Sequence, residues 1–132
     1  MRDRAELLRI VDDVYAARIR GDKAALNAYW APGATYRMVG EGCLLPSVPV
    51  GPADATEAVD SLVDKFEFHE MERLNALVED NRASIHWRLV VSRRGCKPVT
   101  TEMHDIWEFD TEGKARSLIQ FIDTALMTSM RE

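Results

Sequence analysis

The apolar residues of this chain change their spacing at Phe66, and this change restricts it to folds that combine helices with a sheet. Before Phe66, three segments carry apolar residues at helical spacing, over residues 3–20, 22–31 and 54–66. After Phe66, segments rich in β-branched and aromatic residues alternate with short polar turns. Helices that lead into hairpin-linked strands indicate an α+β fold with an antiparallel sheet, and we predict one domain over residues 1–132. The strands are predicted near 34–39, 67–78, 83–92, 97–110 and 114–126.

Short sequence signals mark the ends of the helices. Asp3 is followed three residues later by Glu6, and Asp54 by Glu57. At this spacing the side chains can bond the free backbone amides of a first helical turn. Gly21 suits the left-handed turn that commonly ends a helix. We therefore expect one helix to begin after Asp3 and to end at Gly21, and another to begin after Asp54.

The charge balance and composition argue against several classes of partner. The formal net charge is −5, and phosphate binding needs a positive surface, so we expect no nucleic-acid partner. Neither a secretion signal nor an apolar run of membrane-spanning length is found, so we expect a cytoplasmic protein with no membrane partner. Cys43 and Cys96 form no CxxC pair, and the histidines lack paired ligand spacing. We predict reduced thiols, no metal and no cofactor.

Two segments resemble the nuclear transport factor 2-like superfamily, in its SnoaL-like and ketosteroid isomerase-like branch. They are IRGDKAALNAYWAPGATYRMVG at 19–40 and HDIWEFDTEGKARSLIQFID at 104–123. The resemblance implies a cone-shaped, curved antiparallel sheet wrapped around three N-terminal helices, with an internal pocket. Members include ketosteroid isomerase, SnoaL-like polyketide cyclases, limonene epoxide hydrolase, scytalone dehydratase and non-enzymatic carriers. The resemblance therefore indicates the fold and leaves the reaction open.

The predicted strand at 83–92 has one apolar face and one mixed face. His86 and Arg88 belong to the mixed face, which we expect to line the pocket. The apolar face would then be the outer one, and covering it requires a second copy of the chain. We therefore predict a homodimer through the outer sheet face. The apolar face is made of Ile85, Trp87, Leu89 and Val91.

Asp105 is the leading candidate for chemistry. By resemblance it stands at the position of the aspartic acid that donates a hydrogen bond to the oxyanion in ketosteroid isomerase, a known case of a carboxyl kept protonated by an apolar site. Met103 and Trp107 flank Asp105 on its own strand face, and poor solvation there raises the pKa of a carboxyl. The alternative is an Asp that hydrogen-bonds the backbone or a neighbouring Arg.

The rest of the isomerase machinery does not carry over. The tyrosine that donates to the oxyanion falls nearest Val14, with Tyr15 one residue away and turned by about 100° on a helix. The position of the aspartate base falls near Met38. We therefore do not expect ketosteroid isomerase activity itself.

His86 and Arg88 are expected to share a face with Asp105 and to act with it. A neutral imidazole suits a general base at neutral pH, and Arg88 could pin an enolate or a carboxylate, or neutralise Asp105. The alternative is a polar network that fills and orders the pocket. In the Asp-Arg-Asp constellation of limonene epoxide hydrolase, the second Asp position falls on Gln120, which cannot act as a base but can hydrogen-bond a ligand.

The sequence leaves the roles of three further polar residues open. His69 resembles one histidine of scytalone dehydratase by its position, and it could line the pocket or lie at its rim or on the surface. His104 should face away from Asp105 on an alternating strand. Asp123 could orient His86 or cap the pocket. The side chains predicted to contact a substrate are Tyr15, Trp30, Tyr36, Met38, His69, Trp107 and Gln120.

These features support two hypotheses of function. The first is a cofactor-independent enzyme that transfers a proton, by isomerisation, dehydration or cyclisation, on a small apolar substrate, with a cyclic one expected. In it, His86 is the base, Asp105 a hydrogen-bond donor and Arg88 the anion stabiliser. The second is a module that binds a hydrophobic ligand or dimerises without turnover.

Overall fold

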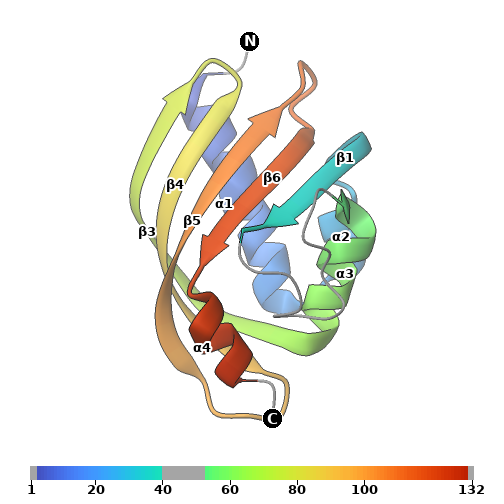
Figure 1. Cartoon of the computed structure of the whole chain (residues 1–132). Coiled ribbons are helices and arrows are strands. Elements are labelled where there is room, and N and C mark those ends of the chain that lie inside the picture. Colours follow the sequence, from blue (N-terminus) through green and yellow to red (C-terminus); the bar gives the residue numbers. More distant parts are fainter. Residues whose placement is uncertain (1–2, 40–52, 131–132) are drawn as a thin grey trace.

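The computed structural model describes residues 3–39 and 53–130, and its elements follow the predicted order (Figure 1). The predicted loop over residues 40–52, with Cys43, lies outside the described residues. The helices are α1 (Arg4–Arg20), α2 (Lys23–Asn27), α3 (Ala55–Lys65) and α4 (Thr124–Ser129). The strands are β1 (Trp30–Met38), β2 (Ala53–Asp54), β3 (Phe66–Glu79), β4 (Arg82–Arg93), β5 (Val99–Phe109) and β6 (Ala115–Ile122).

The predicted helix caps are confirmed. The Asp3 carboxylate accepts from the backbone amide of Glu6 at 2.9 Å, and that of Asp54 accepts from Glu57 at 3.0 Å. Gly21 ends α1 at a φ of 69°, a conformation in which a side chain would be strained. α2 stops at Asn27, short of the predicted residue 31, because β1 already begins at Trp30.

The sheet is mixed, which corrects the prediction of an antiparallel one. Its strand order is β2-β1-β6-β5-β4-β3, and β1 runs parallel to β6 while the other neighbours are antiparallel. A parallel pair is possible because α3 and three long strands separate β1 from β6 in the sequence. β6 also ends at Ile122, short of the predicted residue 126. Asp123 instead accepts from the amide of Leu126 at 3.0 Å and starts α4, so it neither orients His86 nor caps the pocket.

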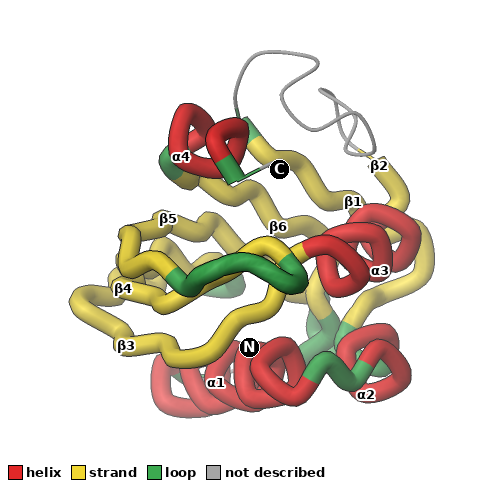
Figure 2. The backbone as a smooth tube through the Cα atoms, turned by 90° about the horizontal axis from the view of Figure 1, so that it is seen from below, coloured by secondary structure: helices red, strands yellow, loops and turns green. Residues whose placement is uncertain are grey.

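The core lies between the inner face of the curved sheet and the helices. In Figure 1 the sheet passes in front of α1, and Figure 2 shows α1, α2 and α3 gathered against it. The apolar face of β4 points inward, with Ile85, Trp87 and Leu89 each at most 3% exposed. The expectation that this face is the outer one is therefore wrong. The helices already cover one side of the sheet, and the apolar face belongs against them.

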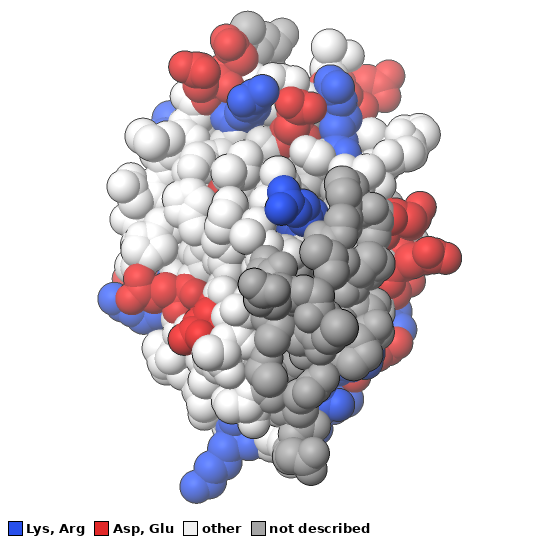
Figure 3. All heavy atoms as spheres, in the orientation of Figure 1, with Lys and Arg blue, Asp and Glu red and all other residues white. Residues whose placement is uncertain are grey.

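The outer face of the sheet carries the mixed side chains of β4 and its neighbours. Figure 3 shows few charges over the middle of this face, with most of them at its edges. Phe121 on β6 is 42% exposed. The homodimer through this face stays a prediction. Among the described residues, no helix combines the length and apolar character that a bilayer crossing demands.

Candidate functional site

A fully buried carboxyl group lies at the centre of the inner sheet face. Asp105 on β5 is 0% exposed, and its Oδ2 atom accepts hydrogen bonds from the hydroxyl of Tyr15 and from two indole N–H groups. Those indoles belong to Trp87 at 3.0 Å and Trp107 at 3.1 Å. The alternative prediction is that Asp105 bonds the backbone or a neighbouring Arg. These contacts differ from it, because all three donors are neutral side chains. The carboxyl is held by neutral side chains of α1, β4 and β5.

Gln120 extends this network toward β1. It lies opposite Asp105 in the β5–β6 register, so both side chains point to the same face. Its Nε2 atom donates to Oδ1 of Asp105 at 3.2 Å and to the oxygen of Tyr15 at 3.0 Å. Its Oε1 atom accepts from the hydroxyl of Tyr36 at 2.6 Å. Four strands and one helix are thereby tied together by a network whose members are all at least nine-tenths buried.

Burial decides how this carboxyl titrates. Desolvation raises the pKa of Asp105 to about 6, although the hydrogen bonds from Tyr15, Trp107, Gln120 and Trp87 oppose the shift. Burial also raises the pKa of the Tyr15 phenol, and the neighbouring Asp105 charge raises it further. At neutral pH the pair therefore consists of a largely ionised carboxylate and a protonated phenol. A carboxyl with a pKa near neutrality suits proton transfer.

A cavity adjoins the network between the helices and the sheet. Its atom-free volume, part of which is open to solvent, is about 560 Å³. The walls are mainly apolar and aromatic. They are formed by Val14, Tyr15, Arg18, Leu26, Trp30, Tyr36, Met38, Val59, Leu62, Phe66, Phe68, Met103, Trp107, Leu118, Gln120, Ile122 and Met127.

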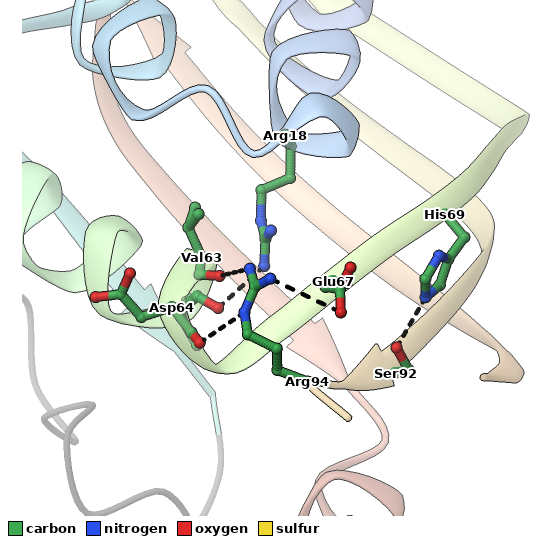
Figure 4. A network of polar contacts seen from close by, with 8 residues as sticks. Arg18, Val63, Asp64, Glu67, His69, Ser92 and Arg94 are labelled. Carbon is green, nitrogen blue, oxygen red and sulfur yellow. Dashed lines mark hydrogen bonds and ion pairs between the residues drawn. The ribbon is translucent and has the colours of Figure 1, made fainter. Parts of the chain in front are cut away.

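Arg18 brings a positive charge to the cavity wall. Its side chain is buried, and its guanidinium lies 4.1 Å from the centre of the Phe68 ring. It donates to the carbonyl of Leu62 at 3.2 Å, near the end of α3. Figure 4 shows Arg18 reaching from α1 toward this helix end, where Arg94 binds the carbonyls of the next two residues. Burial lowers the pKa of Arg18 to about 10, so it stays charged at neutral pH.

Most of the predicted substrate contacts lie on the cavity wall. Asp105 lies behind this wall and reaches the cavity only through Tyr15 and Gln120, which line it. The predicted residues that line the cavity are Tyr15, Trp30, Tyr36, Met38, Trp107 and Gln120.

The expectation that His86 and Arg88 share a face with Asp105 is wrong. In the β4–β5 register Ile85 lies opposite Asp105, so the neighbouring His86 points to the outer face. His86 bonds Glu102 at 2.6 Å, and Arg88 pairs with Glu72 at 2.9 Å, both in exposed positions. Neither side chain lines the cavity. His86 and Arg88 therefore cannot act in the cavity as the predicted base and anion stabiliser.

The remaining histidines also lie away from the cavity. His69 is exposed and bonds Ser92 at 2.8 Å (Figure 4). It follows the buried Phe68 on β3, so strand alternation points it away from the core. His104 faces away from Asp105, as predicted, and bonds Ser84 at 2.6 Å. The surface position left open for His69 is therefore the observed one.

Sequence reasoning missed two residues of this site. Trp87 donates directly to Asp105, whereas the sequence prediction places its face of β4 on the outside. Arg18 falls on the apolar stripe of α1 with Leu7, Val11 and Val14. A charged residue on a core-facing stripe is a signal that could have identified it. Within residues 3–39 and 53–130, no group of three His, Cys, Asp or Glu side chains is arranged to hold a metal ion.

Comparisons with known proteins agree with this architecture. Residues 11–118 match the model of the SnoaL-like domain family. A nuclear transport factor 2-like protein from Burkholderia thailandensis is 22% identical, with a TM-score of 0.71 over 100% of this chain and 99% of that one. An epoxide hydrolase of Mycobacterium tuberculosis that is like limonene epoxide hydrolase is 14% identical, with a TM-score of 0.71 over 95% and 88%.

A third solved structure is TerC, co-crystallised with polyporic acid. It is 13% identical, with a TM-score of 0.75 over 95% of this chain and 97% of that one. At such identities these likenesses establish the fold, and the predicted nuclear transport factor 2-like superfamily is confirmed. No curated protein sequence matches the chain significantly.

Proposed function

Since the chain belongs to the SnoaL-like domain family, we propose that it is a small-molecule enzyme in which Tyr15 and Asp105 transfer a proton. The observation that carries the proposal is the hydrogen bond from a cavity-lining phenol to a sealed carboxylate whose pKa burial raises to about 6. This pair takes the place of the His86 base that the sequence suggested.

The step moves one proton in relay. The Tyr15 oxygen removes a proton from a carbon next to a substrate carbonyl, while the phenol's own proton passes to Asp105. The electron pair of the broken C–H bond remains on the substrate as an enolate. Return of the proton to another carbon gives an isomer, and loss of a β-hydroxyl, which takes up the proton as water, gives a dehydrated product. Every group in this scheme belongs to the chain or the substrate.

The lining of the cavity favours an apolar substrate. Trp30, Trp107 and Phe68 belong to this lining, and an aromatic lining suits a flat or cyclic body. Met38 and Met127 also line the wall, and methionine side chains adapt to ligands of different shape. The similar folds of an epoxide hydrolase and of TerC with polyporic acid support small-molecule chemistry for this chain.

Hydrogen exchange tests the proposal without knowledge of the natural substrate. Cyclic and aryl ketones, some of them carboxylic acids, are incubated with the protein in D2O, and deuterium at the α-carbon is followed by NMR. We expect exchange above the buffer rate with the native protein, and its loss in Tyr15→Phe. His86→Ala is the matched control and should keep the native rate, since His86 lies on the outer face. Exchange that survives Tyr15→Phe refutes the relay.

A second candidate function is ligand binding without turnover. One observation favours it: all the donors around Asp105 are supplied by the chain itself, so the carboxyl is already satisfied without substrate. Ligand binding to the native protein with no exchange on any bound ketone would favour this candidate over the enzyme.

A further inference from the structure

Arg18 is a buried cation on the wall of an otherwise apolar cavity. It is 6% exposed, and it lines the cavity together with Tyr15 and Tyr36. A guanidinium removed from water is unfavourable unless an anion or a full set of acceptors surrounds it. The partners of Arg18 therefore indicate whether the fold or a ligand accounts for its charge.

The described residues supply only part of what this guanidinium requires. One carbonyl, that of Leu62, accepts from it at 3.2 Å, and the Phe68 ring lies against it at 4.1 Å. A guanidinium has several N–H donors in a planar fork that matches a carboxylate. No Asp or Glu among residues 3–39 and 53–130 lies within ion-pair distance of Arg18. A second cation, Arg94, lies close enough to lower the pKa of Arg18.

A second donor on the same wall lacks an acceptor. The indole N–H of Trp30 is buried, and it has no hydrogen-bond partner in the part of the chain that the structure describes. Trp30 stacks on Trp107 with ring centres 6.0 Å apart, so its ring is fixed at the cavity. Two buried acceptors, on Asn27 and Asp60, are also without partners, but neither residue lines the cavity. Among the described residues of the cavity wall, the groups that lack hydrogen-bond partners are therefore donors, on Arg18 and Trp30.

From these two donors we infer that the cavity binds an organic acid, with its carboxylate paired to Arg18, its apolar body among the aromatic walls, and an acceptor oxygen reached by the Trp30 N–H. The inference rests on the proposed function in one respect: if Tyr15 transfers a proton, the organic acid is the class of molecule on which it acts. Binding of the acid requires no turnover and can be tested alone.

A purely structural role for Arg18 makes different predictions, and Arg94 provides the control. Both arginines bond carbonyls at the end of α3, but Arg94 does not line the cavity. If Arg18 only caps this helix, Arg18→Met and Arg94→Met should weaken folding alike. If Arg18 is kept for a ligand, Arg18→Met removes a buried charge without an anionic partner. Its urea midpoint should then equal or exceed that of the native protein.

Calorimetric titration with trans-cinnamate and its neutral amide tests the inference. The two probes share one body and differ in charge. We expect the native protein and Arg94→Met to bind the acid at least about tenfold more tightly than the amide, as a charge-assisted bidentate pair allows. Arg18→Met should abolish this preference. Arg18→Lys, which keeps the charge and loses the fork, should retain part of it.

Three results would overturn the inference. They are equal affinities of the native protein for acid and amide, no binding of either probe, and a preference for the acid that survives in Arg18→Met. None of them bears on hydrogen exchange by Tyr15, which is measured with ketones. Conversely, the protein could prefer the acid through Arg18 and show no exchange activity. That result would support the organic-acid site and contradict the proton relay.

Discussion

The hydroxyl of Tyr15 on α1 donates a hydrogen bond to the carboxyl of Asp105 on β5, which lies 90 positions further along the chain. The contact joins the first helix to the middle of the sheet and places a phenol between a buried carboxyl and the cavity. The stability of the fold and the proposed chemistry therefore depend on the same pair, and each can be measured separately.

Tyr15→Phe should destabilise the fold. It removes a hydroxyl and leaves the buried carboxyl of Asp105 with one donor fewer, for which a loss of about 1–3 kcal/mol in the free energy of unfolding is expected. Urea unfolding at neutral pH measures this loss. Tyr29→Phe is the control, because Tyr29 lies outside the cavity wall and away from Asp105. Equal losses in the two variants would contradict the account.

Asp105 should make the protein less stable as pH rises from about 4 to 6. Its folded pKa of about 6 exceeds the ordinary value of 3.8, so in this range the folded state holds a proton that the unfolded state has released. The stabilisation is complete below the ordinary pKa and is lost by about pH 6, a change of about 3 kcal/mol.

The comparison with Asp105→Asn isolates this effect, because all other titrating groups are common to both proteins. Urea unfolding of native protein and variant is measured across the acidic range. The native protein should gain stability relative to the variant as pH falls from 7 to 4. A constant difference between the two would mean that the pKa of Asp105 is not raised.

Trp107→Phe should raise the pKa of Asp105 further. The indole N–H bonds the ionised carboxylate at 3.1 Å, and this bond lowers the pKa of that group. Without it, the pH at which exchange activity reaches half its maximum should shift upward from about 6. Rate profiles of α-proton exchange against pH measure the shift. A midpoint that stays in place or moves downward would show that this indole does not stabilise the carboxylate.

His86→Ala and Arg88→Ala should have little effect. Both side chains pair with glutamates on the outer face, where an ion pair contributes about 0–1 kcal/mol. The free energy of unfolding should change by no more than about 1 kcal/mol. Exchange activity and acid binding should match those of the native protein. A large loss of activity in either variant would mean that the base or the anion site lies on the outer face.

Local signals explain why so much of the fold could be predicted from the sequence. The caps at Asp3 and Asp54 and the strand segments after Phe66 depend on neighbours within a few residues. The parallel pairing of β1 with β6 joins residues about eighty positions apart, such as Tyr36 and Leu118. Neither strand carries a local mark of its partner's direction, so the mixed sheet could not be predicted in this way.

The site was predicted only in part because strand alternation fixes faces relative to each other and not relative to the core. The pattern correctly set Asp105 with Met103 and Trp107, and His104 on the opposite face. Whether His86 or its neighbour joined Asp105 depended on the register between β4 and β5. The structure shows which face of β4 is the inner one, because Ile85, Trp87 and Leu89 are buried.

Carbon-13 NMR titration of the Asp105 carboxyl measures whether burial and the Tyr15 phenol set its pKa. The signal is assigned by its absence in Asp105→Asn, and its pH dependence is followed in the native protein and in Tyr15→Phe. We expect an apparent pKa of about 6 for Asp105 in the native protein. We expect a higher value in Tyr15→Phe, because the phenol stabilises the carboxylate. An apparent pKa close to the ordinary 3.8, unchanged by the loss of the Tyr15 hydroxyl, would contradict this expectation.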